Sequence, residues 1–146
     1  LRKHFEIYIN IYRRDCPFEI VATHRYNDTH INASVIARCD IKAGEEVKYL
    51  IGFSVAIDED QENLLALTDS DFSLIVSSRR KTCSLFLGPA RFANHDCDAN
   101  AKLMATGHNS VKIVAMRPIS MGDEVTVSYG GDYFGAGNKE CLCHTC

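Results

Sequence analysis

The sequence predicts one mostly-β domain with a few short helices, of the α+β class. Three observations carry this prediction. Short runs rich in β-branched residues recur along the chain, turn sequences such as KAGE, ATGHN and SMGD separate them, and only DEDQENLLAL reads clearly as a helix. With 146 residues, of which 46% are hydrophobic, the chain can bury one ordinary core but not two. We therefore expect an irregular set of small sheets with short helices beside them.

The first segment, residues 1–12, fits two patterns. Apolar residues at 1, 5, 8, 9 and 12 form a helical stripe, whereas those at 5, 7, 9 and 11 alternate as in a strand, and we favour the helix. A second helix is expected over residues 58–67. The β-type runs are residues 18–23, 34–41, 46–53, 71–78, 83–88, 102–106, 111–116 and 124–129.

Two segments of the chain resemble each other. ARCDIKAGEEV, residues 37–47, and AMRPISMGDEV, residues 115–125, share Ala, Ile, Gly, Glu and Val in the same register. Either the fold contains a structural duplication, or two hairpin-like connections have converged on the same turn residues. Both explanations require β structure on either side.

Composition limits the classes of partner. The formal net charge of -3 argues against a broad DNA-binding surface, because neutralising several phosphates needs a basic excess. No stretch approaches the roughly 18 apolar residues of a membrane span, so a soluble protein without membrane contact is expected. The acidic residues between positions 58 and 71 could attract a cationic peptide, although such runs are more often solvated faces. Because the chain starts without Met or a leader, we expect a fragment with no targeting segment.

The cysteines point to a metal site. There are seven, an odd number, and four stand singly in apolar or strand-like sequence, so a disulfide framework is not expected. The other three, Cys141, Cys143 and Cys146, lie in the terminal CLCHTC, a spacing that suits zinc in a reducing compartment. Tetrahedral zinc needs a fourth ligand, for which His144 is the local candidate and a distant thiolate the better one. Cys97 is the natural choice, because it lies in the polar cluster RFANHDCDAN.

If zinc joins Cys97 to the terminal triplet, the tail must fold back over residues 94–97 and form a wall of a site there. A shell of four thiolates has no open position, so the zinc would be structural and not catalytic. No His-x-Glu pattern like that of zinc deaminases lies next to Cys97 or the terminal cysteines.

Three motifs, in this order, resemble those of SET-domain lysine methyltransferases: FANHDCDAN, GDEVTVSYG and CLCHTC. The form NHDC, LGPARF before it, DFSLIVSSRRK, GGDYFG and the compact cysteine tail are similar to the histone H4 lysine-20 methyltransferases of the suppressor-of-variegation 4-20 type, in a fungal-like form. The resemblance covers essentially the whole chain. It implies a SET-domain fold of small sheets: a helical lead-in at 1–22, the SET domain at 23–135 and a zinc-binding post-SET loop at 136–146. The sequence departs from the family at residues 32–34, where NAS replaces Gly-x-Gly and makes close approach of a cofactor harder.

The resemblance implies transfer of a methyl group from S-adenosylmethionine to a lysine, leaving S-adenosylhomocysteine. It assigns the catalytic phenol to Tyr129. Contacts to the cofactor are expected from Arg25, Tyr26, Asn27, Asp28, Asn32, Ser78, Ala93, Asn94, His95 and Phe134. Walls of the lysine channel are expected from Phe72, Ser73 and Tyr133. Structural zinc is expected on Cys97, Cys141, Cys143 and Cys146, with Asp96 as a local turn acceptor.

The chemistry of the reaction agrees with such a site. Free lysine has a pKa of about 10.4 and is therefore charged at neutral pH. An apolar channel beside a sulfonium must favour the neutral amine by desolvation and charge repulsion. Most of the rate should then come from holding amine, methyl and sulfur in line. The resemblance implies a monomeric nuclear domain acting on the histone H4 tail of nucleosomes, with DNA contact only through chromatin. Two alternatives stay open: an inactive SET-like interaction module held together by zinc, or the same enzyme with another protein substrate.

Overall fold

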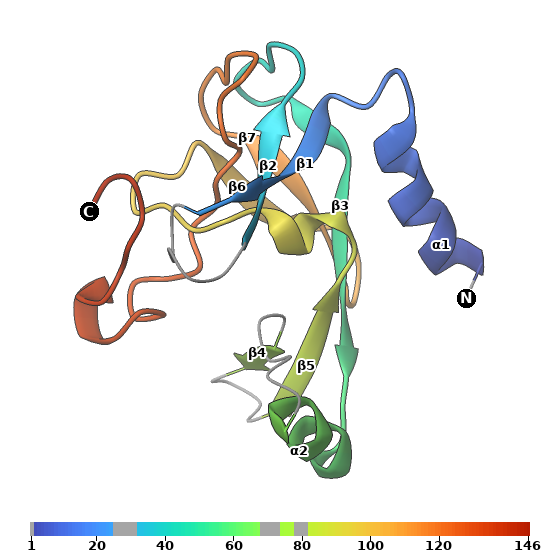
Figure 1. Ribbon diagram of the computed structural model, residues 1–146, viewed down its shortest axis with the longest axis vertical. Helices are drawn as coiled ribbons and strands as arrows, with labels where there is room; N and C mark the ends of the chain where they lie inside the picture. The colour runs from blue at the N-terminus through green and yellow to red at the C-terminus, as the bar shows by residue number, and fades with distance from the viewer. Residues whose placement is uncertain (1, 25–31, 68–73, 78–81) are drawn as a thin grey trace.

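The computed structural model describes residues 2–24, 32–67, 74–77 and 82–146, and two antiparallel sheets form the framework of this part of the chain (Figure 1). A two-stranded sheet pairs β1 (Phe18–Thr23) with β2 (Asn32–Ala37). The larger sheet has the order β4-β5-β3-β7-β6. Its strands are β3 (Glu46–Ala56), β4 (Leu74–Ser77), β5 (Thr82–Leu87), β6 (Ala101–Ala105) and β7 (Ser110–Ala115). The predicted mostly-β fold is confirmed.

The first segment is helical, as favoured: α1 (Arg2–Ile9) continues into a 3₁₀ turn, η1 (Asn10–Tyr12). One side of α1 packs on the large sheet. The His4 ring meets the edge of Phe53 on β3 at 5.4 Å between centroids, and the Tyr8 hydroxyl accepts a hydrogen bond from the Gly88 backbone N–H at 2.9 Å. His4 and Tyr8 lie one helical turn apart on the same face of α1, with their ring centroids 5.1 Å apart, and both side chains face the large sheet.

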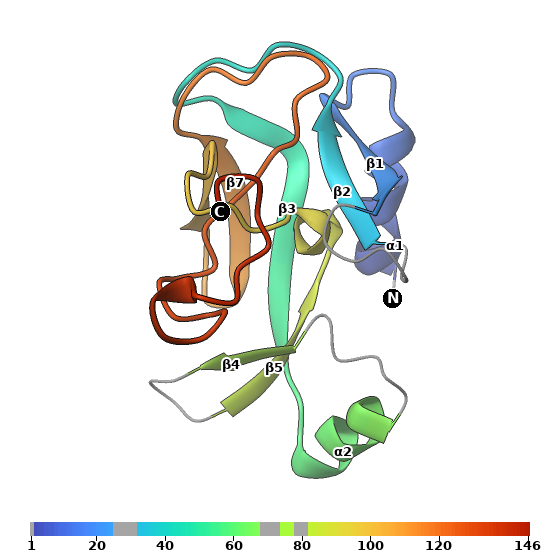
Figure 2. The same cartoon turned by 60° about the vertical axis from the view of Figure 1, so that its left-hand side comes forward.

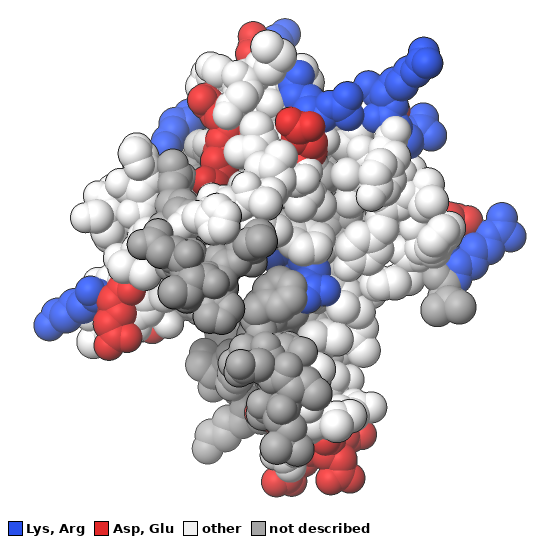
Figure 3. All heavy atoms as spheres, viewed as in Figure 1, with Lys and Arg blue, Asp and Glu red and all other residues white. Residues whose placement is uncertain are grey.

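The second predicted helix is also confirmed, as α2 (Glu59–Leu67). Asp58 and Gln61 form a reciprocal cap: the Gln61 N–H donates to the Asp58 carboxylate and the Asp58 N–H to the Gln61 side-chain oxygen. In both ribbon views, β4, β5 and α2 lie at the end of the molecule opposite the β1–β2 pair (Figures 1 and 2). Acidic side chains gather at that end (Figure 3), because the first turn of α2 is acidic. Their negative charges interact favourably with the positive N-terminal end of the helix dipole.

The long strand β3 lies in the middle of the large sheet and pairs with β5 on one side and β7 on the other. Its pairing with β7 is irregular between Glu46 and Ile51, and within this stretch Tyr49 has a φ of 68°, which is rare for an aromatic residue. The core lies between the two sheets and is mostly aliphatic. Its largest fully buried side chains are those of Phe18, Leu50, Ile113, Ile119, Val35, Val47, Val125, Val127 and Pro89.

Two of the expected strands differ from the structure. The run 34–41 ends as a strand at Ala37, and Ile41 forms only an isolated bridge. Residues 124–129 are not a strand. The Val125 N–H donates to the Val35 carbonyl, the Val127 N–H donates to the Asn94 carbonyl, and the Thr126 carbonyl accepts from the N–H of Ala101. Because its backbone groups bond to three different segments in turn, this buried stretch never forms a ladder with one neighbour.

Among the helices in the described residues, none has both the length and the apolar character to cross a lipid bilayer. The C-terminal residues 136–146 include a short 3₁₀ turn, η3 (Ala136–Asn138), and fold back beside the segment that precedes β6. Two contacts hold this tail: the Cys97 N–H points at the Cys143 sulfur, and Thr145 donates a hydrogen bond to Asp96. The expected return of the tail over residues 94–97 is thus what the structure has.

Candidate functional site

A pocket of about 340 Å³ opens between residues 94–95, the segment 129–134 and the C-terminal tail. That volume falls within the range of about 300–1,000 Å³ usual for small-molecule and cofactor sites. It is lined by Asn32, Asn94, His95, Tyr129, Tyr133, Phe134, Glu140, Cys141, Leu142 and Cys143. Residues that the sequence predicts to contact the cofactor, line the lysine channel and bind the metal therefore meet around one cavity.

Tyr129 is held at the pocket by both ends of the residue. Its hydroxyl donates a hydrogen bond to the Ala93 carbonyl at 2.8 Å, and its backbone N–H donates to Nδ1 of His95 at 3.0 Å. The side chain is still 37% exposed, so one part of the ring faces the opening while the hydroxyl is fixed. Ala93 itself is buried, and it takes part in the site through its carbonyl.

Aromatic rings surround Tyr129. Its ring centroid is 4.9 Å from that of Tyr133, in an edge contact, and 6.3 Å from that of Phe134, which is nearly parallel to it. Phe134 also packs 5.2 Å from the His95 ring. These side chains give the pocket an apolar wall. A charged group that lies against such a wall loses contact with water and is desolvated.

Asn94 is fixed by its amide nitrogen. Nδ2 donates to the Ala33 carbonyl of β2 at 2.9 Å and to the Glu124 carboxylate at 3.0 Å. Both amide hydrogens are thereby used, so Oδ1 is the polar atom that the side chain can still offer to a ligand. The Asn94 carbonyl accepts from the Val127 N–H, and this bond ties the residue to the segment that leads to Tyr129.

His95 is a buried histidine, 3% exposed, and burial lowers its pKa. Its ring accepts from the Tyr129 N–H through Nδ1, and its Nε2 lies 3.4 Å from the Cys97 sulfur. A neutral imidazole is the form that can accept at Nδ1.

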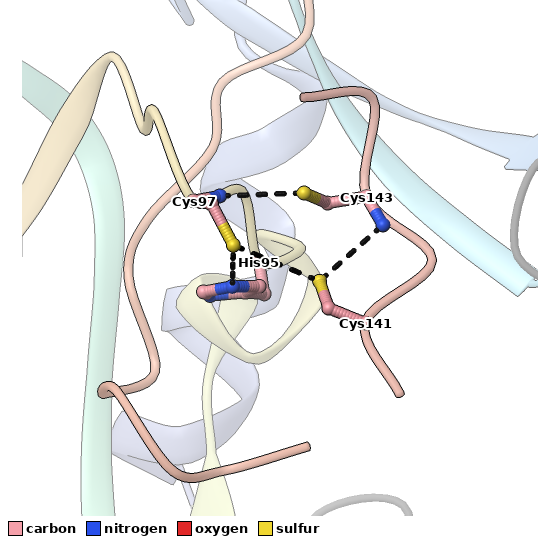
Figure 4. A group of neighbouring side chains, drawn as sticks. All are labelled: His95, Cys97, Cys141 and Cys143. Atoms are coloured by element: carbon pink, nitrogen blue, oxygen red, sulfur yellow. Dashed lines mark hydrogen bonds between the residues drawn. The ribbon is translucent and has the colours of Figure 1, made fainter. Parts of the chain in front are cut away.

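The sulfurs of Cys97, Cys141 and Cys143 gather where the tail meets Cys97 (Figure 4), and the Cys146 sulfur lies beside that of Cys97. The Cys97 sulfur lies 3.9 Å from that of Cys141 and 3.5 Å from that of Cys146, and the Cys143 sulfur accepts from the Cys97 N–H at 3.4 Å. Zinc–sulfur bonds of 2.3 Å in a tetrahedron put the sulfurs about 3.8 Å apart, so this spacing fits a thiolate-bound zinc. The ligand atoms of His95, Cys97, Cys141 and Cys143 also lie within 4.8 Å of one another. The cysteine cluster is consistent with a zinc site.

Polar contacts support the cluster. Burial by itself raises the pKa of the Cys143 thiol, but the N–H groups of Cys97 and Cys146 outweigh it and lower that pKa to about 7, toward the thiolate that metals bind. Burial likewise raises the pKa of Asp96, yet hydrogen bonds from Thr145 and from the Asp98 N–H lower it on balance. The expected turn role of Asp96 is thus present, and its carboxylate also anchors the tail.

Several of the residues predicted from sequence lie outside the described part of the chain: Arg25, Tyr26, Asn27, Asp28, Phe72, Ser73 and Ser78. Asn32 begins β2 and lines the pocket from that side. The sequence reasoning missed Glu140 and Leu142, which also line the pocket. Their signal was available, because each is adjacent to Cys141, and a metal-bound loop that forms a wall of the pocket must bring its neighbours with it.

Comparison with known proteins identifies the family. The family model described as SET domain matches residues 32–130, which is more than half of the chain. The histone-lysine N-methyltransferase SET9 of Phaeosphaeria nodorum is 60% identical over 145 residues, 99% of this chain and 22% of that protein. The protein of the same name from Gibberella zeae is 54% identical with the same coverage, and set9 of Neurospora crassa is 50% identical over 99% of this chain and 19% of that protein.

The chain thus spans about a fifth of the length of these curated relatives. A crystal structure of a Plasmodium falciparum protein has the same fold, with a TM-score of 0.56 and 21% identity, and it covers 81% of this chain and 96% of that one. The match over residues 32–130 and the close relatives agree with the pocket and the cysteine cluster: this chain belongs to the SET-domain family.

Proposed function

We propose that this chain is the catalytic domain of an S-adenosylmethionine-dependent histone-lysine N-methyltransferase. The observation that carries the proposal is the fixed phenol of Tyr129, bonded to the Ala93 carbonyl at the mouth of a pocket that Asn94 and His95 also line. The close relatives named as histone-lysine N-methyltransferases support the same activity. In this reading Tyr129 is the catalytic residue.

The pocket suits the cofactor chemically. S-adenosylmethionine supplies a methyl group on a positively charged sulfur, and it leaves as S-adenosylhomocysteine. Asn94 can accept from the ammonium of the cofactor through Oδ1, since both of its amide hydrogens are already donated. Phe134 and Leu142 offer apolar surface to a flat base, and Asn32 offers an amide. Contacts from Arg25, Tyr26, Asn27, Asp28 and Ser78 remain predictions.

The residues around Tyr129 favour attack by a neutral amine. A lysine that enters beside Tyr133 and Phe134 loses water, and this lowers its pKa because the ammonium is the form that desolvation disfavours. The Tyr129 hydroxyl, held by the Ala93 carbonyl, presents its oxygen at a fixed place next to the reacting groups. Rate then depends on alignment, which fixed side chains supply without a strong base. Phe72 and Ser73 are proposed as further channel walls.

We further infer that zinc is bound by Cys97, Cys141, Cys143 and Cys146 and that its role is structural. Four thiolates close the coordination shell, so no position remains for a substrate. The metal would hold residues 140–143 against the pocket, which two of the proposed ligands, Cys141 and Cys143, line directly. The division into a lead-in at 1–22, a SET domain at 23–135 and a zinc loop at 136–146 belongs to the same proposal.

The proposed substrate is lysine-20 of histone H4 within nucleosomes, so the domain would act in the nucleus, on chromatin, as a monomer. The support is the motif set NHDC, LGPARF, GGDYFG and CLCHTC, which is similar to that of the histone H4 methyltransferases. The net charge of -3 fits a basic histone tail as partner better than the DNA around it.

The deciding experiment incubates the zinc-loaded chain with labelled S-adenosylmethionine and recombinant nucleosomes. We expect label on histone H4, its loss when lysine-20 of that histone is replaced by alanine, and a fall of at least about 100-fold in Tyr129→Phe. Tyr12→Phe is the matched control, because Tyr12 is 85% exposed on η1 and does not line the pocket at Tyr129. Label on another protein would change the substrate. No label together with no thermal stabilisation by the cofactor would leave an inactive interaction module.

A further inference from the structure

We propose that His95 is a positioning residue whose imidazole connects the metal-bound sulfur of Cys97 to the backbone of Tyr129, so that metal binding fixes the orientation of the phenol. This inference rests on the proposed function for the role of Tyr129 and for the metal bound at Cys97, but not on methyl transfer. His95 is buried, and its ring lies beside the cysteine sulfurs (Figure 4). The same ring packs 5.5 Å from that of Tyr129 and 5.2 Å from that of Phe134.

The hydrogen bonds of His95 fix its tautomer. The Tyr129 N–H points at Nδ1 at 3.0 Å, and an N–H donor requires a lone pair on the atom that it meets. Nδ1 therefore carries no hydrogen, and in a neutral imidazole the hydrogen must be on Nε2. Nε2 lies 3.4 Å from the Cys97 sulfur, so the ring donates there. A metal-bound thiolate is a better acceptor than a thiol, and this bond is therefore strongest when the metal is present.

The same argument disfavours His95 as a metal ligand. Its ligand atom lies within 4.8 Å of those of Cys97, Cys141 and Cys143, so distance alone would allow a His-Cys₃ site. Coordination needs a lone pair on the nitrogen, and the single lone pair of the neutral ring is already used by Tyr129. Cys146, 3.5 Å from Cys97, is then the fourth ligand and His95 stands outside the shell.

Both anchors of Tyr129 belong to one short segment. Its hydroxyl bonds to the Ala93 carbonyl and its N–H to the His95 ring, while Cys97 follows two residues later. The segment is itself fixed, because His95 forms a parallel bridge with Val127 and the Asp96 N–H donates to the Val127 carbonyl. A shift of Cys97 on loss of the metal would thus reach Tyr129 through the ring and not through a flexible loop.

Two conservative variants separate the two halves of the connection. His95→Asn can keep an acceptor near Nδ1 for Tyr129 but loses the donor to Cys97. His95→Gln can keep the donor near Nε2 but loses the acceptor. His108→Asn is the matched control, because His108 is exposed in the turn before β7.

The experiment is NMR on the 146-residue chain loaded with NMR-active cadmium in place of zinc, with labelled nitrogen. We expect coupling from the Nε2 hydrogen of His95 to the metal through the sulfur, lost in His95→Asn. We expect exchange of the Tyr129 amide hydrogen to become roughly tenfold faster in His95→Gln and after chelation of the metal, the factor for one lost hydrogen bond. His108→Asn should leave both signals unchanged.

Direct one-bond coupling between a ring nitrogen of His95 and cadmium would make His95 a ligand and overturn the inference. An unchanged Tyr129 amide after chelation would overturn it as well. Neither readout requires methyl transfer, so either failure would leave the proposed activity standing. Conversely, if methyl transfer were absent but both signals behaved as expected, the connection from Cys97 through His95 to Tyr129 would hold. Only its role in catalysis would be wrong.

Discussion

Ile41 and Ile119 exchange both of their backbone hydrogen bonds, each 2.9 Å long, at the centre of the two segments that share a sequence pattern. The bonds on either side are also equivalent. The Gly44 N–H donates to the Ala115 carbonyl as the Gly122 N–H donates to that of Ala37, both at 2.8 Å. The two glycines have similar positive φ values, 80° and 93°. The segments thus pair about a local two-fold axis, an arrangement that a structural duplication would produce.

The first prediction follows from this pairing. Ile41 and Ile119 are 3% and 1% exposed, so replacing either by Ala should lower the free energy of unfolding by about 2–4 kcal/mol. Because the two residues are directly paired, the double variant should lose less than the sum of the single losses. Urea unfolding measures all three. Ile9→Ala on the exposed side of α1 is the control, and strict additivity would show that the two sites are independent.

A second prediction concerns Asn100, whose side chain holds the segment before Tyr129. Its Nδ2 donates to the Glu124 carbonyl at 2.8 Å and its Oδ1 accepts from the Thr126 N–H at 2.9 Å. Asn100→Ala leaves the buried Thr126 N–H without its acceptor, so the free energy of unfolding should fall by about 2–4 kcal/mol. Asn109→Ala, in an exposed turn, should change it by less than about 0.5 kcal/mol. Equal losses in the two variants would contradict the role given to Asn100.

Local signals in the sequence were enough where structure is local. The helix expected over residues 58–67 begins at the expected place, where Asp58 and Gln61 cap it. Residues 124–129 show the limit, because alternation of Val, Thr and Val looks the same whether one strand or three separate segments supply the partners. The positive φ of Tyr49 has no sequence signal either, since a neighbouring cluster and not the residue type stabilises it. For the site, motifs indicated which residues meet but not their bonds, such as that from Tyr129 to Ala93.

A third prediction tests the packing of the central strand. Gly52 on β3 has no room for a side chain: a Cβ there would lie 2.4 Å from the ring of Phe86 and 3.0 Å from Cβ of Ala90. Phe86 packs against the buried core, so its ring can move only by opening that contact. Gly52→Ala should lower the free energy of unfolding by about 1–3 kcal/mol. Gly131→Ala is the control, because no atom lies within 4 Å of the added carbon, and it should be nearly neutral in the same thermal or urea unfolding assay. A similar loss of stability in Gly131→Ala would mean that losing a glycine, and not the clash with Phe86, causes the effect.

A fourth prediction concerns pH and the junction between the lead-in and β3. The Asp15 carboxylate accepts from Lys48 at 2.6 Å, from Arg13 at 2.9 Å and from the Tyr49 hydroxyl at 2.9 Å. These bonds, that from Lys48 first, hold the pKa of Asp15 well below its usual range. A lowered carboxylate pKa stabilises the fold above the unfolded value of about 3.9, and this stabilisation is lost as pH falls below it.

Asp15→Asn should therefore be less stable than the unmodified chain at pH 7, and the difference should shrink as the pH falls from about 4 toward 2. Urea unfolding across this range measures it. Glu6→Gln is the control: it removes an exposed pair with Arg2 within α1, for which little change at any pH is expected. A difference for Asp15→Asn that stays constant with pH would mean that the charge of Asp15 does not matter.

The last prediction concerns the metal. Cys146 is exposed and ends the chain, yet its sulfur lies 3.5 Å from that of Cys97, so Cys146→Ser should remove a zinc ligand. Zinc affinity should then fall by more than about 100-fold, the upper end of what changes outside the ligand shell produce. Cys39→Ser is the matched control, since Cys39 is also exposed but lies far along the chain from the cluster. The zinc content of this variant should equal that of the unmodified chain. Elemental analysis after dialysis against a weak chelator gives the stoichiometry. If Cys146→Ser kept one tightly bound zinc per chain, the fourth ligand would have to be another residue. His95 would then have to release the Tyr129 N–H in order to serve, and hydrogen exchange at that amide would reveal it.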